Sequence, residues 1–144
     1  MITVKEIMTT ELVTLKQTDN LETARTIMYE RGIRHIPLID DDTKLVGLVT
    51  QRDVLRASTS TLEGDKHLID ESQISLGDIM TGNVSFAHPK DSLRVAGIEL
   101  QKEKYGCLPV VENDKLVGII TDTDFVGVAI DLIEHMDFAE DSEF

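Results

Sequence analysis

The stretch that decides the fold occurs twice in the chain, as Gly47-Leu48-Val49-Thr50-Gln51-Arg52-Asp53 and as Gly118-Ile119-Ile120-Thr121-Asp122-Thr123-Asp124. In each copy an apolar run ends at a threonine, and an aspartate follows three positions later. A short apolar run rich in β-branched residues predicts a buried strand. Threonine and an acidic residue at this spacing resemble a capping box, which predicts the start of a helix. Each stretch therefore indicates a strand that turns directly into a helix.

The match between the two halves continues outward from these turns in constant order. An offset of 72 residues places Ile7-Met8-Thr9 on Ile79-Met80-Thr81 and Pro37 on Pro109, and the offset becomes 71 after a one-residue slip at 40–43. The chain is therefore a tandem duplication. Solenoid repeats are shorter, about 20–50 residues. A period near 70 predicts two half-domains packed about a pseudo-two-fold axis.

Each copy is predicted to form one βαββα unit, which places the chain in the mixed α/β (α+β) class. The expected elements are capping boxes at 3–6 and 75–78, extended pieces at 12–15 and 84–87, helices at 20–31 and 92–104, strand pairs at 36–39 with 45–49 and at 108–111 with 116–120, and last helices that open at 50 and 121. Gly32 is placed to end the first helix, and Gly106 follows the end of its counterpart. The last helix carries an apolar stripe from Phe125 to Met136, which fits either a core face or a subunit interface.

These signals divide the chain into four parts. Residues 1–57 form repeat one, 58–74 an acidic linker, 75–137 repeat two, and 138–144 an acidic tail. The linker is long and lacks strong periodicity, so we expect partial mobility there. The acidic runs are interpreted as solubilising surface.

The composition excludes several classes of protein. The 144 residues carry a net charge of −13 with no Lys/Arg cluster, which argues against a nucleic-acid partner. No apolar run approaches the roughly 20 residues of a membrane span, and the N-terminal residues do not resemble a signal peptide. The one cysteine, Cys107, excludes an intrachain disulfide. We therefore expect a cytoplasmic protein, with Cys107 as a core residue rather than a reactive thiol.

The repeated turn can carry chemistry as well as structure. A helix N-terminus attracts phosphate through its free N–H groups and its dipole, and the carboxylate of an aspartate can accept both hydroxyls of a ribose. The preceding glycine could let a ligand approach the backbone closely. The alternative is purely structural, because a helix needs an N-cap whether or not it binds a ligand.

The duplicated Gly-h-h-Thr-x-x-Asp, where h is an apolar residue, follows Pro-Leu-Ile in one copy and Pro-Val-Val in the other. With the Ile-Met-Thr signatures at Met8 and Met80, it resembles the CBS-domain family over residues 3–137. The run 104–111 is similar to the small acetoin-utilisation-type proteins of that family. The resemblance implies a CBS pair that binds an adenosine nucleotide (AMP, ADP or ATP, with S-adenosylmethionine or NAD possible), requires no cofactor, and signals to a protein partner in trans as a homodimer.

The resemblance also implies a set of binding residues. Asp53 and Asp124 would hold the riboses of two ligands, with Thr50 and Thr121 near the phosphates. Each site would borrow residues around the partner repeat's Pro strand and early extended piece. The remaining candidates are Val13, Arg34, His35, Ile36, Arg52, Ser85, Gly106, Cys107 and Thr123. For His35, a structural hydrogen bond and a ligand contact remain open.

This borrowing predicts that the two sites are unequal. The Asp124 site would receive Arg34, His35 and Arg52, whereas the Asp53 site would receive uncharged residues. We therefore expect the Asp124 site to prefer a phosphorylated ligand, although Asp122 adds an opposing negative charge there.

Catalysis and metal binding are not expected. The sequence contains no nucleophile elbow, Walker loop or redox motif. His67, His88 and His135 are scattered without metal-ligand spacing. The alternative to a nucleotide sensor is a dimerising scaffold that binds no nucleotide.

Overall fold

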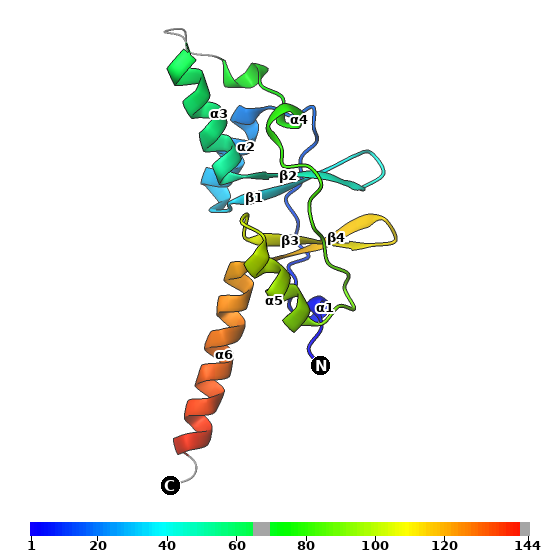
Figure 1. Cartoon of the computed structure of the whole chain (residues 1–144), viewed down its shortest axis with the longest axis vertical. Helices are drawn as coiled ribbons and strands as arrows, with labels where there is room; N and C mark the ends of the chain where they lie inside the picture. The colour runs from blue at the N-terminus through cyan, green and yellow to red at the C-terminus, as the bar shows by residue number, and fades with distance from the viewer. Residues whose placement is uncertain (65–69, 142–144) are drawn as a thin grey trace.

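The computed structural model describes residues 1–64 and 70–141 and builds them into two similar halves (Figure 1). In chain order the elements are α1 (Val4–Ile7), α2 (Leu21–Arg31), β1 (His35–Ile39), β2 (Leu45–Thr50), α3 (Gln51–Gly64), the 3-10 turn η1 (Glu71–Gln73), α4 (Leu76–Ile79), α5 (Leu93–Lys102), β3 (Cys107–Glu112), β4 (Lys115–Thr121) and α6 (Asp122–Asp141). The two hairpins lie next to each other, and α3 and α6 leave them in opposite directions (Figure 1). The predicted mixed helix-and-strand repeat is confirmed.

Each hairpin is a two-stranded antiparallel sheet, β1 with β2 and β3 with β4. The predicted extended pieces at 12–15 and 84–87 do not form full strands. They make single parallel bridges, Leu15 to Leu38 and Ala87 to Val110. Extending each parallel ladder back toward residue 13 or residue 85 would need an N–H from Pro37 or Pro109, which proline lacks. Each unit is therefore a hairpin between helices, with an extended segment touching its edge at one residue.

The opening turns of the two copies are exchanged. Val4 of α1 belongs to the hydrophobic core of repeat two, and Leu76 of α4 belongs to the core of repeat one. Paired backbone hydrogen bonds fix the exchange: Thr9 and Ile119 bond each other at 2.8 and 3.0 Å, and Leu48 and Thr81 at 3.0 and 2.8 Å. Each core is therefore completed by a segment of the other repeat.

This exchange explains the glycine of each repeated turn. A Cβ on Gly118 would lie 2.7 Å from Met8 Sδ and 3.1 Å from the Thr9 carbonyl oxygen, and a Cβ on Gly47 would collide with Met80. From the sequence, this glycine was expected to leave room for a ligand close to the backbone. The structure corrects that expectation, because the Ile-Met-Thr signature of the other copy occupies the space beside the glycine.

The ends of several elements also differ from expectation. The capping box at Thr3 forms, with its N–H donating to Glu6 Oε2 at 2.8 Å, but Ser75 makes no side-chain cap to α4. Gly32 ends α2 at φ 62°, whereas α5 ends at Lys102, two residues earlier than expected, with Glu103 as its C-cap. Helix α3 continues to Gly64, into the segment expected as a linker; residues 65–69 of that segment lie outside the described residues.

Helix α6 extends beyond the folded half. Its first turns pack Phe125 and Val128 on the core of repeat two. Further along, Leu132, Ile133 and Met136 are 55%, 56% and 66% exposed. The apolar stripe therefore serves the core only at its N-terminal end. The helix runs to Asp141 and so includes part of the expected acidic tail, whereas residues 142–144 lie outside the described residues.

Candidate functional site

The turn between β2 and α3 forms the predicted capping box. The Thr50 N–H donates to Asp53 Oδ2 at 2.9 Å, and the Asp53 N–H donates to Thr50 Oγ1 at 3.1 Å. Across the exchanged segment, the Thr81 hydroxyl donates to the same Asp53 oxygen at 3.2 Å. Both Thr50 and Asp53 are buried. These contacts hold one carboxylate oxygen of Asp53 in place at the N-terminus of α3.

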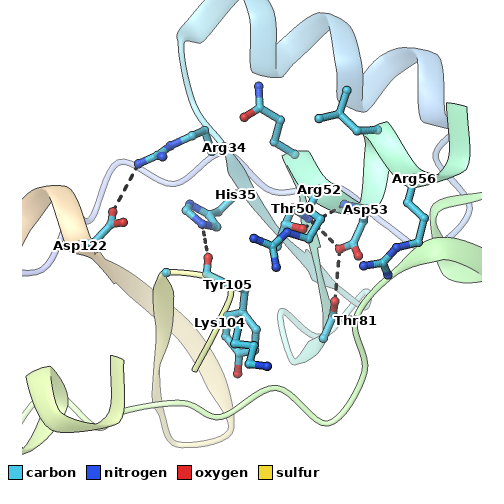
Figure 2. A pocket seen from close by; sticks show the side chains of 13 residues that line it. Arg34, His35, Thr50, Arg52, Asp53, Arg56, Thr81, Lys104, Tyr105 and Asp122 are labelled. Atoms are coloured by element: carbon cyan, nitrogen blue, oxygen red, sulfur yellow. Dashed lines mark hydrogen bonds and ion pairs between the residues drawn. The ribbon is translucent and has the colours of Figure 1, made fainter. Parts of the chain in front are cut away.

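This turn forms one wall of a cleft of about 430 Å³, which we call the Asp53 cleft (Figure 2). Repeat one supplies the capping box, the first turns of α3 and the residues at the start of β1. Repeat two supplies Thr81, the Lys104-Tyr105-Gly106 turn and Asp122. The cleft therefore exists only because the two repeats pack against each other, as the family resemblance implies.

The Asp53 cleft is strongly basic for so acidic a chain. Among the described residues, four of the chain's 14 lysines and arginines line it, together with two carboxylates, Asp53 and Asp122. The four cations are Arg34, Arg52, Arg56 and Lys104. Figure 2 shows Arg52 and Arg56 on either side of Asp53 and Lys104 below them. Such a cluster beside a helix N-terminus suits a phosphate group.

A second cleft of about 260 Å³, the Thr121 cleft, is the counterpart of the first under the internal duplication. Thr121 corresponds to Thr50 and Thr9 to Thr81, and both members of each pair line their own cleft. The cations do not recur. Thr123, Gly127 and Gly32 occupy the positions that correspond to Arg52, Arg56 and Lys104.

This comparison corrects the predicted inequality of the two sites. Arg34 and His35 line the Thr121 cleft, as expected, but they also line the Asp53 cleft, and Arg52 lines the Asp53 cleft alone. Glu11 and Asp122 both line the Thr121 cleft. The structure therefore gathers positive charge around Asp53. The expectation was wrong because it assigned Arg52 to the site of the other repeat and did not include Arg56 or Lys104.

The two aspartates also differ in their surroundings. Asp124 repeats the capping box, since the Thr121 N–H donates to its Oδ2 at 2.9 Å. However, Asp124 lies outside the residues that line either cleft and is less buried than Asp53. For Asp124, the structural interpretation of the motif accounts for the contacts seen.

His35 and Arg34 lie at the junction of the two repeats. His35 donates from Nε2 to the Tyr105 carbonyl oxygen, and Arg34 pairs with Asp122 at 3.4 Å. Burial lowers the pKa of His35 below its usual value, against the hydrogen bond to Tyr105. His35 therefore makes the structural hydrogen bond and lines both clefts, so the two readings of this residue coexist.

The remaining candidates have other places. Val13 lines the Thr121 cleft. Ile36 and Cys107 are fully buried in the two halves, and burial raises the pKa of the Cys107 thiol to about 12. The expectation that Cys107 is a core residue is confirmed. Ser85 supports the wall of the Asp53 cleft, because its N–H donates to the Tyr105 hydroxyl at 3.1 Å.

Sequence reasoning missed six residues that line the Asp53 cleft: Gln51, Leu55, Arg56, Thr81, Lys104 and Tyr105. A signal existed for Arg56, which follows Arg52 by four positions and so shares its helix face. Thr81 belongs to the Ile-Met-Thr signature of repeat two. Tertiary packing brings Lys104 and Tyr105 of repeat two to the cleft, and no local sequence pattern indicates this.

Within residues 1–64 and 70–141, no helix is both long and apolar enough to cross a membrane. In the same described parts of the chain, no three or more His, Cys, Asp and Glu side chains are grouped as a metal site would require.

Comparison with known proteins identifies the family. The sequence matches the CBS domain family over residues 4–60 and 76–131. Its structure is similar to the AcuB protein from Vibrio cholerae, with 42% identity, coverage of 95% of this chain and 98% of that chain, and a TM-score of 0.85. It is also similar to CBSX2 from Arabidopsis thaliana, which was solved in complex with AMP (29% identity, 92% and 98% coverage, TM-score 0.78).

A third similar structure is the CBS domain pair of MJ0100 in complex with 5′-methylthioadenosine and S-adenosyl-L-methionine (26% identity, 88% and 94% coverage, TM-score 0.75). The chain spans 41% of the uncharacterized protein MJ1225 of Methanocaldococcus jannaschii, to which it is 34% identical over 123 residues. It spans 23% of a homoserine O-acetyltransferase from Methanohalobium evestigatum. The shared part is therefore the duplicated unit, and the chain belongs to the CBS-domain family as a tandem pair of the AcuB type.

Proposed function

We propose that this CBS pair is a regulatory module that binds a phosphorylated adenosine ligand in the Asp53 cleft and has no catalytic role. One observation carries the proposal: the cleft between the repeats is lined by Arg52, Arg56 and Lys104 together with the buried Asp53. The complexes of CBSX2 with AMP and of the MJ0100 pair with two adenosine compounds support an adenosine ligand.

Each residue has a role that its chemistry supports. Asp53 accepts hydrogen bonds from the ribose hydroxyls, since an ionised carboxylate offers several acceptor positions. The two arginines and Lys104 neutralise the phosphate, with the N-terminus of α3 behind them. This charge favours AMP, ADP or ATP over S-adenosylmethionine, which carries a positive sulfonium, and NAD is kept as a further candidate.

Isothermal titration calorimetry with AMP tests the binding site. Asp53→Ala is compared with Asp124→Ala, because both substitutions break the same kind of capping box but only Asp53 lines the cleft. Loss of a hydrogen bond to a charged group costs about 1.5–3 kcal/mol, so we expect Asp53→Ala to weaken AMP binding about tenfold or more. Equal weakening by both variants, or a larger effect of Asp124→Ala, would contradict the assignment.

A second specific observation favours self-association. Among the described residues of α6, several apolar side chains that do not pack on the core are more than half exposed. They are Val126, Ile130, Leu132, Ile133, Met136 and Phe138. We propose that this face joins two copies of the chain into a homodimer, which then presents the nucleotide state to a protein partner in trans.

Light scattering after size exclusion tests the homodimer. Ile133→Asp places a charge within the exposed apolar face and should yield monomers, whereas His135→Asp, on the same helix, is the control for added charge. A monomeric wild-type chain would contradict the proposal.

The alternative function is a dimerising scaffold that binds no nucleotide. Thermal melting with AMP, ADP, ATP, S-adenosylmethionine and NAD separates the two functions. A ligand present at 100 times its dissociation constant stabilises the folded state by about 2.7 kcal/mol. Absence of any shift across this panel would favour the scaffold.

A further inference from the structure

One ion pair lies between the two clefts and lines both of them. Arg34 Nη2 lies 3.4 Å from Asp122 Oδ1, and both residues line the Asp53 cleft and the Thr121 cleft. Arg34 precedes β1 in repeat one, and Asp122 opens α6 in repeat two. In Figure 2 the Arg34 side chain points away from Asp53 and toward Asp122. The pair therefore connects the two repeats at a place that both clefts share.

The Arg34–Asp122 pair can open at low cost. Both side chains are 55% exposed, and exposed ion pairs contribute little to folding stability. A phosphate is a strong competitor for the arginine, because guanidinium binds it through two parallel charge-assisted hydrogen bonds. A phosphorylated ligand in either cleft can therefore draw Arg34 away from Asp122.

The two clefts depend on Arg34 to different degrees. The Asp53 cleft has three further cations, Arg52, Arg56 and Lys104. Among the described residues that line the Thr121 cleft, Arg34 is the sole lysine or arginine, and the carboxylates of Glu11 and Asp122 line the same cleft. Without Arg34, the Thr121 cleft offers a phosphate mainly negative charge.

We propose that the two clefts compete for Arg34, so that a phosphorylated ligand in the Asp53 cleft weakens the binding of a second phosphorylated ligand in the Thr121 cleft. The first ligand recruits Arg34 and leaves Asp122 as an unpaired carboxylate in the second cleft. This inference rests on the proposed binding of a phosphorylated adenosine ligand in the Asp53 cleft. Because coupling between binding sites is reciprocal and typically about 5- to 150-fold, we expect at least about a fivefold effect.

The test is an AMP titration of the full ¹⁵N-labelled chain, followed by amide chemical shifts. The amides of Arg52 and Asp53 report on the Asp53 cleft, and those of Thr121 and Thr123 report on the Thr121 cleft. The blocking variant combines Arg52→Ala with Lys104→Ala, two residues that line the Asp53 cleft and not the Thr121 cleft. The same double substitution is also made in an Arg34→Gln background.

Blocking the Asp53 cleft should tighten AMP binding in the Thr121 cleft about fivefold or more, and this gain should vanish in the Arg34→Gln background. The loss of two positive charges would by itself weaken binding of an anion, so net charge cannot mimic the result. An unchanged, weaker or absent response of Thr121 and Thr123 in the blocked variant overturns the proposal, as does a gain that persists without Arg34. If Arg52 and Asp53 do not respond to AMP in the wild-type chain, the proposed function itself fails.

Discussion

Replacement of Gly118 by alanine tests the exchange of the opening turns. The added Cβ would lie 2.7 Å from Met8 Sδ and 3.1 Å from the Thr9 carbonyl oxygen. Methionine is flexible and can move in part. The Thr9 carbonyl cannot move freely, because it accepts a hydrogen bond from the Ile119 N–H at 3.0 Å. The crowding is therefore relieved only by shifting a segment that completes the core of repeat two.

The magnitude follows from two opposing effects. Overpacking of a tight contact costs about 1–3 kcal/mol. Alanine also restricts the unfolded chain, which returns about 0.4–1 kcal/mol. We expect Gly118→Ala to lower the free energy of unfolding by about 1–2 kcal/mol, or the Tm by about 3–7 °C for a chain of this size.

The assay is urea unfolding followed by circular dichroism, with Gly82→Ala as the matched control. A Cβ on Gly82 meets no atom within 4 Å, so that variant should lose no stability. In a Met8→Ala background, the cost of Gly118→Ala should fall, because the 2.7 Å contact with Met8 Sδ is removed and contacting sites are not additive, while the part due to the Thr9 carbonyl should remain. Equal stability of Gly118→Ala and Gly82→Ala, or an undiminished cost after Met8→Ala, would show that the exchanged segment does not constrain Gly118.

Three further predictions concern single residues. Gly127→Ala, within the exposed part of α6 and with no atom within 4 Å of the added Cβ, should raise the free energy of unfolding by about 0.5–1 kcal/mol in the same urea assay; a loss would contradict the exposed helix. Iodoacetamide at pH 8 should modify Cys107 on the order of a thousandfold more slowly in the folded than in the unfolded chain, because a pKa of about 12 leaves almost no thiolate. Mass spectrometry measures the two rates. Similar rates would show that the thiol is accessible and ionised in the folded chain. Because the pKa of His35 is lowered in the folded chain, the unfolded chain binds the proton more readily. The contribution of His35 to the free energy of unfolding should therefore be complete above pH 6.5 and decline as the pH falls through its folded pKa. His35→Gln should flatten this part of the plot of unfolding free energy against pH, and an unchanged plot would contradict the shift.

The sequence predicted most of the elements because the duplication supplied each signal twice. The β1–β2 and β3–β4 hairpins begin and end within about one residue of expectation, since short β-branched runs between polar turns are strong local signals. The capping boxes of α3 and α6 formed as expected for the same reason.

The predictions that were wrong concern features that depend on contacts between residues far apart in the chain. No local pattern indicates that Val4 completes the core of repeat two or that Leu76 completes the core of repeat one. The exchange in turn decides what lies beside Gly47 and Gly118. The extended pieces at 12–15 and 84–87 were expected as strands because their propensity was considered without the prolines on the neighbouring strand.

The candidate site was predicted in kind but not in distribution. Thr50 and Asp53 were identified from the motif and Arg34 from the family resemblance, which assigned it to the other site; all three line the Asp53 cleft. The concentration of cations there depends on Arg56, one helical turn beyond Arg52, and on Lys104, which tertiary packing brings across from the other repeat. The charge that Lys104 adds to the cleft can be recognised only when the relative placement of the two repeats is known.

A crystal structure of the chain grown with AMP shows directly where the nucleotide binds. We expect AMP in the Asp53 cleft, with the ribose hydroxyls on the Asp53 carboxylate and the phosphate among Arg52, Arg56 and Lys104. AMP seated solely in the Thr121 cleft, or an Asp53 cleft that stays empty at millimolar AMP, would contradict it.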